Sequence, residues 1–297
     1  MQLTLLPFNQ KSSKHLSITC IDDISAGAIE ACKDEKKPLC VVVDERGYTF
    51  MLKFGIGKRR KFARKEIKVL THIKSFSHVE KLLWSCETET TTLLLKEYYF
   101  GLRPNIQTFK QLVQCGSDGE IRASLFQILF TLIHIRKSIP GFKHNDLKTD
   151  NIIVTEPGFK QSYALVHDGL RRVWQTTGCN TKIIDFESAH SYLFGKQDEE
   201  ELCDDFGITE IDSEVFDVHL LLRDALTNCK RLSIYEPLRL FATSFIPEKF
   251  FNTANLTKQL RLKPQDQRLD LSIPAMLCHP YFAHLRGDAH ESVSYEI

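Results

Sequence analysis

Short runs of apolar residues, separated by turn-forming residues, mark the first hundred positions of the chain. Residues 39–44 (LCVVVD) and 48–54 (YTFMLKF) are such runs, and the residues between them include a glycine, which is typical of a β-hairpin. Residues 91–99 (TTLLLKEYY) are rich in threonine and leucine and predict a further strand. We therefore expect this part of the chain to form a small antiparallel sheet.

Helical spacing replaces this pattern over residues 58–76. Four apolar residues mark the face that is predicted to be buried: Phe62, Val69, Leu70 and Ile73. Glu66 falls on the same face, and an ionised carboxylate is costly to bury without a partner. Lys53, which ends the strand-like run FMLK, is the natural partner, so the sequence predicts a Lys53–Glu66 ion pair.

After the first hundred residues the pattern becomes mainly helical. Residues 121–138 are apolar on almost every side, as expected of a helix buried on most of its surface, and residues 213–226 predict another apolar helix. Short apolar strands are predicted at 151–155 (NIIVT) and 181–186 (TKIIDF). The change near residues 97–101 predicts an α+β chain with a small strand-rich lobe and a larger helical lobe. A ligand site between two such lobes is the default expectation.

Composition narrows the class of protein without naming an activity. The 297 residues are 42% hydrophobic and 26% charged, which excludes collagen-like, low-complexity and broadly disordered classes. With 39 Lys and Arg against 38 Asp and Glu, we expect no binding to nucleic acid or to an anionic membrane. No apolar stretch approaches the roughly 20 residues of a membrane helix, and no signal peptide is recognised. Nine cysteines without a Cys-x-x-Cys pair favour a soluble protein in a reducing, intracellular compartment.

The most informative polar groups lie in residues 144–154 (HNDLKTDNIIV). Asp146, Lys148 and Asn151 occupy a polar loop between a buried helix and an apolar strand. Phosphoryl transfer needs such a set: a carboxylate that orients the attacking hydroxyl, a cation near the transferred phosphate and an oxygen ligand for Mg²⁺. Asp185 follows a second apolar strand, where its carboxylate is placed to hold a metal.

These segments resemble eukaryotic-type protein kinases, whose catalytic loop reads H-R-D-L-K-x-x-N and whose metal-binding segment reads D-F-G. The resemblance implies that Asp146 is the catalytic base, Lys148 contacts the phosphate and Asn151 is the second metal ligand. It also implies that Asp185 is the principal Mg²⁺ ligand, and that His144 packs the loop without acting as a base. A lysine at position 148 implies the Ser/Thr class, which transfers phosphate from ATP to a hydroxyl of a protein substrate.

The same family supplies roles for residues nearer the start of the chain. Lys53 matches the lysine of V-A-I-K, which holds the α- and β-phosphates, and Glu66 matches its partner on the following helix. The segment KEYY resembles the hinge that offers hydrogen bonds to adenine, which implies contacts at Glu97 and Tyr99. It also puts Lys96 at a position where the family usually has an uncharged residue.

The far end of the chain agrees with this resemblance. Asp217 resembles the aspartate of D-V-W-S-x-G, which braces the catalytic loop from beneath. Residues 265–282 resemble the closing R-x-[ST]-x-x-x-[LM]-L-x-H-P-[WY]-F element. The motifs follow the family's order over residues 18–285, nearly the whole chain.

The resemblance implies one α+β kinase domain with the two-lobed kinase-like fold. Its expected parts are the whole domain, 1–297; the N-lobe, 1–96; the hinge, 97–101; the C-lobe, 102–297; and an insertion in the C-lobe, 155–181. The insertion separates the two strands that carry the expected metal ligands, where the family usually has a short hairpin.

Several residues depart from the family pattern. Of the glycine-rich phosphate loop, residues 24–32 keep only Gly27, which predicts weaker nucleotide binding or a differently shaped loop. Asn145 replaces the arginine of H-R-D, and Glu187 replaces the glycine of D-F-G and adds a carboxylate near the metals. No A-P-E sequence is found before Asp217, so Arg268, which pairs with its glutamate in the family, has no identifiable partner.

These departures leave two other activities open. One is a pseudokinase, a nucleotide-binding or scaffolding module that keeps the fold without catalysis. The other is a small-molecule kinase of the aminoglycoside or choline type, against which Lys148 and the closing H-P-Y-F element argue. The basic run 58–61 is interpreted as an exposed helix face in preference to a phosphate-binding or nuclear-targeting segment, and the acidic run 198–201 as a solvated loop.

The departures also resemble the divergent kinases of large DNA viruses, such as poxviruses and iridoviruses. The sequence is accordingly expected to encode an ATP- and Mg²⁺-dependent Ser/Thr protein kinase. It would act on a protein in the cytoplasm or, for a viral protein, in the host cell or the virion.

Overall fold

The computed structural model describes residues 3–7, 39–44, 49–99, 106–155, 160–195, 204–287, 293 and 295–297. The chain is of the α+β class, with helices and small sheets that are antiparallel except where β11 pairs with β8, and its contacts divide it into two compact units. The first unit comprises Met1–Ser75, Glu80–Pro104 and Asp185–Glu187; the second comprises Phe76–Val79, Asn105–Ile184 and Ser188–Ile297. Within the described segments, no helix has the length and apolar character needed to cross a membrane.

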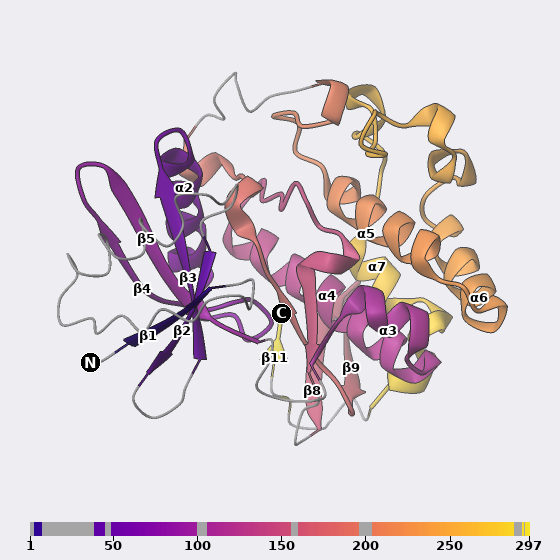
Figure 1. Cartoon of the computed structure of the whole chain (residues 1–297). Helices are drawn as coiled ribbons and strands as arrows, with labels where there is room; N and C mark the ends of the chain where they lie inside the picture. The colour runs from indigo at the N-terminus through magenta and orange to yellow at the C-terminus, as the bar shows by residue number, and fades with distance from the viewer. Residues whose placement is uncertain are drawn as a thin grey trace. The chain divides into compact units, whose positions relative to one another are not determined.

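The first unit is built on a five-stranded sheet in which every neighbouring pair is antiparallel (Figure 1). In spatial order the strands are β1 (Leu3–Pro7), β2 (Leu39–Asp44), β3 (Thr49–Ile56), β5 (Thr91–Glu97) and β4 (Leu82–Glu87). The three predicted strands are therefore confirmed as β2, β3 and β5. β5 is buried at every position except its last, because it is flanked by β3 and β4 and contacts α2.

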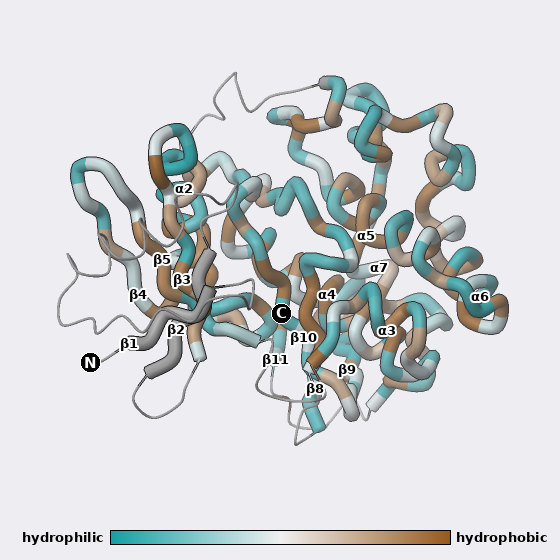
Figure 2. The backbone as a smooth tube through the Cα atoms, viewed as in Figure 1, coloured by the Kyte–Doolittle hydropathy of each residue, from teal (hydrophilic) through white to brown (hydrophobic). Residues whose placement is uncertain are grey.

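The helix predicted after β3 is α2 (Arg59–His72), and it packs on β3 and β5. Its buried residues are Ala63, Glu66, Val69 and Leu70. Gly55 of β3 allows this close approach, since a Cβ atom there would lie 2.6 Å from that of Ala63. Phe62 was predicted on the buried face, and this is wrong: the first turn meets β3 through Ala63, and the Phe62 side chain is left 38% exposed. Figure 2 shows hydrophobic and hydrophilic stretches alternating along α2.

The second unit is mainly helical. Its helices are α3 (Phe109–Cys115), α4 (Asp118–Ser138), α5 (Glu214–Asn228), α6 (Leu232–Thr243) and α7 (Ile273–Cys278). The prediction for α4 is confirmed, because its buried residues lie on almost every side of the helix. α4 begins at a capping box in which the Ser117 side chain accepts from the Glu120 N–H, and the Glu120 side chain accepts from the Ser117 N–H.

Two three-stranded sheets complete the second unit. The first runs in the order β10 (Asn180–Ile183), β7 (Ile152–Thr155) and β6 (Gln107–Thr108), and the second in the order β11 (Tyr295–Glu296), β8 (Gln161–His167) and β9 (Leu170–Thr176). The expected insertion thus forms the β8–β9 hairpin, which turns at Asp168 and Gly169 with positive φ. Tyr163 and Trp174 of this hairpin are fully buried and contact the ring of Phe126 on α4. The β8–β9 hairpin is therefore part of the core of the second unit.

Short 3₁₀ helices connect these elements. They are η1 (Thr149–Asn151), η2 (Phe186–Ser188), η3 (Tyr192–Phe194), η4 (Asp204–Phe206), η5 (Glu248–Phe251), η6 (Thr253–Asn255), η7 (Pro264–Asp266) and η8 (Pro280–Leu285).

His219 on α5 links that helix to η5. Its ring is fully buried, and Nε2 lies 2.6 Å from the carbonyl oxygen of Phe250. Within the described residues, Nδ1 is buried without a hydrogen-bond partner. Burial lowers the pKa of His219 to about 4, because the imidazolium form would have a second N–H with no acceptor.

We predict that His219 makes the protein acid-sensitive. The native pKa is below the ordinary 6.5, so the unfolded chain binds the proton more tightly, and stability falls as the pH drops from about 6.5 to about 4. The expected loss is up to about 3 kcal/mol in the free energy of unfolding. His219→Gln keeps an N–H donor for Phe250 but cannot titrate, so urea unfolding of this variant should show a shallower dependence over that range. Equal slopes for the two proteins would contradict the prediction.

Candidate functional site

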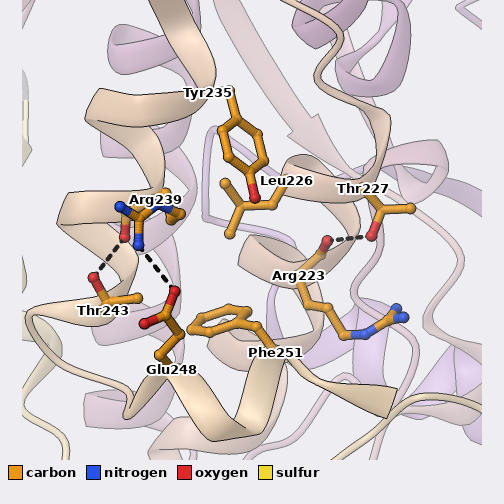
Figure 3. A pocket seen from close by; sticks show the side chains of 8 residues that line it. All are labelled: Arg223, Leu226, Thr227, Tyr235, Arg239, Thr243, Glu248 and Phe251. Atoms are coloured by element: carbon orange, nitrogen blue, oxygen red, sulfur yellow. Dashed lines mark hydrogen bonds and ion pairs between the residues drawn. The ribbon is translucent and has the colours of Figure 1, made fainter. Parts of the chain in front are cut away.

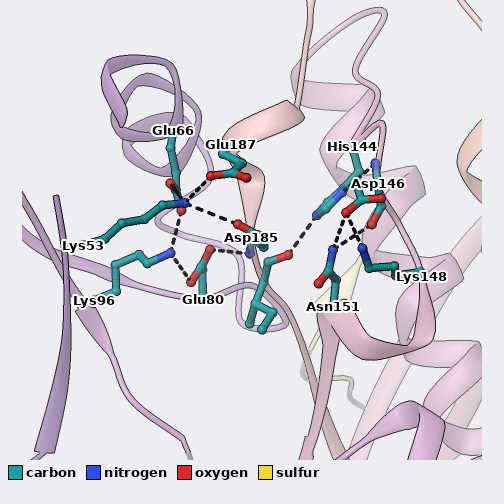
Figure 4. A network of polar contacts seen from close by, with 11 residues as sticks. Lys53, Glu66, Glu80, Lys96, His144, Asp146, Lys148, Asn151, Asp185 and Glu187 are labelled. Atoms are coloured by element: carbon teal, nitrogen blue, oxygen red, sulfur yellow. Dashed lines mark hydrogen bonds and ion pairs between the residues drawn. The ribbon is translucent and has the colours of Figure 1, made fainter. Parts of the chain in front are cut away.

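The loop before η1, together with η1 itself, brings three predicted site residues together in the second unit (Figure 4). The carboxylate oxygen Oδ2 of Asp146 accepts from Lys148 Nζ at 2.8 Å and from Asn151 Nδ2 at 3.1 Å. Asn151 Nδ2 also donates to the carbonyl oxygen of Asp146 at 2.9 Å. The amide oxygen of Asn151 points away from Asp146. This oxygen is the atom that is predicted to bind a metal.

Asp217 of α5 holds this loop from its backbone side. Its two carboxylate oxygens accept the backbone N–H groups of His144 at 2.6 Å and Asn145 at 3.0 Å. The bracing contact expected of Asp217 is therefore present. Asn145 has a φ of 64°, a left-handed conformation that asparagine tolerates better than most residues, and its Nδ2 donates to the carbonyl oxygen of Ser188 at 2.9 Å. The side chain and backbone of Asn145 thus shape the loop.

His144 has the structural place expected of it. The residue is fully buried, and Nε2 lies 3.0 Å from the carbonyl oxygen of Ile184. The backbone N–H of Ile184 donates in turn to the carbonyl oxygen of Asn151 at 3.0 Å. These contacts fix the end of β10, and the next residue in the chain is Asp185.

Asp146 is held as an anion. Burial would raise the pKa of its carboxyl group, but Lys148 and then Arg261 outweigh burial and lower the pKa below its ordinary value. Such a group is ionised at neutral pH. It can accept a hydrogen bond from a hydroxyl and orient it, which is the role that phosphoryl transfer requires.

A second cluster of charges lies within the first unit (Figure 4). Lys53 Nζ is 2.7 Å from Glu66, 2.8 Å from Glu187 and 3.4 Å from Asp185. The predicted Lys53–Glu66 ion pair is thus confirmed. Burial would lower the pKa of Lys53, but the three negative partners outweigh it and raise the pKa.

Lys96 enlarges this cluster in a way that the sequence did not predict. Its side chain is 4% exposed, and its Nζ lies 2.5 Å from Glu66 and 3.0 Å from Glu80. Glu80 also accepts the backbone N–H of Asp185 at 2.7 Å. A lysine inside the apolar run of β5 requires a buried carboxylate nearby, which is the signal that could have pointed to Glu80.

The two fully buried carboxylates respond differently to Lys96. Burial would raise the pKa of Glu66, but Lys96 and Lys53 together lower it. Burial also raises the pKa of Glu80, and here Lys96 compensates only in part while the charge of Glu66 adds to the rise. The cluster contains four carboxyl groups and two ammonium groups, counting Asp185 and Glu187. Its excess of negative charge favours a cation.

Arg261 is the functional candidate that sequence reasoning missed in the second unit. Its Nη2 donates to Oδ1 of Asp146 at 2.7 Å, and its side chain is 8% exposed. The two residues are 115 positions apart in the chain. No local sequence motif predicts this contact, because it arises from the packing of segments that are distant in the chain.

The contacts of the remaining predicted site residues do not test the roles expected of them. The Tyr99 hydroxyl donates to the Glu97 carboxylate, and burial followed by this contact raises the pKa of Tyr99. The N–H of Glu97 donates to the carbonyl oxygen of Lys81 at 3.1 Å. Their contact with adenine remains a prediction. Gly27 and the phosphate loop lie outside the described residues.

The donor atoms suit the metal that the sequence implies. Asp185 in the first unit carries a carboxylate, and Asn151 in the second unit carries an amide oxygen; each is a type of ligand that Mg²⁺ prefers. Among the described residues, no group of three or more His, Cys, Asp or Glu is arranged to hold a metal ion by itself. Mg²⁺ is commonly bound by one or two carboxylates together with substrate phosphates.

The second unit also contains a cavity of about 150 Å³ between α5, α6 and η5 (Figure 3). It is lined by Arg223, Leu226, Thr227, Tyr235, Arg239, Thr243, Glu248 and Phe251. None of these residues belongs to the predicted site. Arg239 pairs with Glu248 at 2.9 Å across its wall.

No protein-family model matches the chain, and no curated protein matches it either.

We predict that Lys96→Met destabilises the protein more than Lys53→Met. Removing Lys96 leaves the buried Glu80 without its ammonium partner, whereas Glu66 keeps Lys96 when Lys53 is removed. Loss of one partner from a buried ion pair should cost about 3 kcal/mol in the free energy of unfolding, measured in urea.

The double variant Lys96→Met/Glu80→Gln provides the control. Because it removes both partners, it should be more stable than Lys96→Met alone. Equal losses for Lys53→Met and Lys96→Met, or a further loss in the double variant, would contradict the assigned network.

Proposed function

We propose that this protein is an ATP- and Mg²⁺-dependent Ser/Thr protein kinase with a two-lobed, kinase-like fold. The observation that carries the proposal is the contact of Lys148 and Asn151 with one oxygen of Asp146, in a loop that Asp217 braces. Phosphoryl transfer depends on positioning and on charge stabilisation, and these residues provide both.

Each residue of the loop has a role in this reaction. Asp146 would accept a hydrogen bond from the substrate hydroxyl and take up its proton as the hydroxyl oxygen bonds to the γ-phosphorus of ATP. The bond from that phosphorus to the β,γ-bridging oxygen would break at the same time, and ADP would leave. Lys148 would stabilise the negative charge on the transferred phosphoryl group. Asn151 would hold a metal through its amide oxygen while its Nδ2 keeps Asp146 in place.

The first-unit cluster supports a nucleotide phosphate site. Lys53 would contact the α- and β-phosphates, and Glu66 would hold its ammonium group in position. Asp185 and Asn151 would be the Mg²⁺ ligands, and the bound ion would neutralise charge on the phosphates. Glu80 and Lys96 support this role of Asp185 indirectly, since Glu80 binds its backbone N–H.

The division of the chain supports the proposed fold. The first unit holds a five-stranded antiparallel sheet and the helix α2, as the N-lobe of such a kinase would. The second unit holds the helices and Asp146, and the β8–β9 hairpin is the insertion. Asp185–Glu187 groups with the first unit by its contacts, although the residues on either side belong to the second.

One observation favours a nucleotide-binding pseudokinase as the second candidate. Glu187 stands where the family has a glycine, and it lies 2.8 Å from Lys53 Nζ. An ammonium group that already faces three carboxylates is less available to a phosphate. The pseudokinase would bind Mg²⁺·ATP without transferring phosphate.

Substitution of the catalytic loop tests the proposal. With labelled ATP, Mg²⁺ and a cell extract, the wild-type protein should label protein serine or threonine, whereas Asp146→Asn should lower the rate at least about 100-fold. Lys53→Met should have a similar effect. Asp270→Asn and Lys230→Met change the same residue types at exposed positions and should leave the rate unchanged.

A thermal-shift measurement with Mg²⁺·ATP separates the candidates. Stabilisation of the wild-type protein without transfer would favour the pseudokinase, and labelling of small molecules alone would favour the small-molecule kinase. Transfer by Asp146→Asn at the wild-type rate would contradict the assigned mechanism.

A further inference from the structure

Arg261 is a buried arginine whose partner is the carboxylate at the centre of the proposed reaction. Its Nη2 lies 2.7 Å from Oδ1 of Asp146, and the residue is 7% exposed. A guanidinium group is rarely buried without a specific role, because it loses strong hydration. Among the described residues, the Nε atom of Arg261 is buried without a hydrogen-bond partner. The contact with Asp146 is therefore the interaction that compensates for the lost hydration.

A tight turn over residues 257–261 delivers this arginine. The N–H of Thr257 donates to the carbonyl oxygen of Arg261 at 2.9 Å, and the N–H of Leu260 donates to that of Thr257 at 2.8 Å. Leu260 has a φ of 62°, a left-handed conformation that is unfavourable for leucine. Such a conformation persists only where the surroundings enforce it, and these residues tend to cluster at functional sites.

The segment that follows the turn is fixed by a buried glutamine. Gln267 Nε2 donates to the carbonyl oxygens of Gly207 at 2.6 Å and Leu262 at 3.2 Å, and its Oε1 accepts from the Thr209 hydroxyl at 2.8 Å. Residues 207–209 lie between η4 and α5. The turn that carries Arg261 is thus joined to this stretch of the chain.

The hydrogen bonds to Asp146 leave one acceptor position for a substrate. Each carboxylate oxygen can accept about two hydrogen bonds. Oδ2 already accepts from Lys148 and Asn151, whereas Oδ1 accepts from Arg261. Within the described residues, the second lone pair of Oδ1 therefore remains for an incoming hydroxyl, and the Asp146 side chain is 23% exposed.

We propose that Arg261 is a positioning residue that fixes the Asp146 carboxylate so that Oδ1 meets the acceptor hydroxyl. This inference rests on the proposed kinase function. Lys148 and Arg261 hold the two oxygens from different segments, so the carboxylate cannot rotate freely. The arginine takes no part in bond making, and its loss should slow the transfer step without weakening nucleotide binding.

The test compares steady-state kinetics of Arg261→Ala, Arg261→Lys and Arg268→Ala. For Arg261→Ala we expect kcat to fall about 100-fold with the KM for ATP unchanged, because misplacement of a catalytic group affects the chemical step. Arg261→Lys should be intermediate, since lysine keeps the charge without the planar fork. Arg268 is an exposed arginine in the same segment, and its alanine variant should match the wild type.

Added guanidinium distinguishes positioning from a structural role. At about 10–50 mM, far below denaturing concentrations, guanidinium chloride should restore part of the rate of Arg261→Ala. It should not raise the rate of the wild type or of Asp146→Asn. Should Arg261→Ala not fold, Arg261→Lys carries the test through its lower kcat at constant KM.

Several results would overturn the inference. These are an Arg261→Ala variant as fast as the wild type or faster, a folded variant that guanidinium does not rescue, or an equal loss in Arg268→Ala. An inactive wild-type protein would instead refute the proposed function. The contact would then be judged by urea unfolding of Arg261→Ala, Asp146→Asn and the double variant: additive shifts of the midpoint would refute it, and non-additive shifts would support it.

Discussion

The first unit depends on the neutralisation of one buried carboxylate. Glu66 is fully buried on α2, and ammonium groups from β3 and β5 meet its two oxygens at 2.7 and 2.5 Å. An uncompensated charge at this depth would cost several kcal/mol. Because Lys53 and Lys96 come from adjacent strands, the pairing also fixes how α2 lies on the sheet. The apolar contacts around it then complete the packing. Charge compensation thus determines how α2 packs on the sheet. The same cluster also holds Asp185, because Glu80 accepts its backbone N–H.

The second unit solves the same problem with different groups. Asp217 is buried, and its carboxylate is stabilised by the backbone N–H groups of His144 and Asn145, which fixes the shape of the loop that contains them. Asp146, at the exposed side of that loop, is compensated by Lys148 and Arg261. A carboxylate held by donors on both oxygens has little rotational freedom. The loss of conformational entropy of the Asp146 side chain has already occurred during folding. A substrate hydroxyl would therefore meet an acceptor that is already oriented.

The sequence predicted those contacts that follow from local periodicity. Helical spacing placed Glu66 on the buried face of α2, and the cost of an unpaired charge then identified Lys53. The contacts of Asp146 with Lys148 and Asn151 are likewise local, because the three residues lie close together in the sequence. Glu80 and Arg261 were missed, because their partners are brought to them by tertiary packing that no short window of sequence contains. Phe62 fits the apolar stripe by spacing alone, but the close contact of Gly55 with Ala63 decides which residue of the first turn is buried.

Backbone conformation gives an independent sign that these sites are specifically built. Within the described residues, the non-glycine residues with positive φ are Asn145, Asp168, Asp185 and Leu260. Asp168 lies in a hairpin turn that requires this conformation. Each of the other three adjoins or is a proposed site residue, and each has its backbone N–H bound: to Asp217, to Glu80 and to the carbonyl oxygen of Thr257. A left-handed residue is unfavourable by about 1–3 kcal/mol, and a hydrogen bond to its own amide is the most direct way to hold it. The acceptors that stabilise these three conformations are therefore as much a part of the proposed sites as the residues they position.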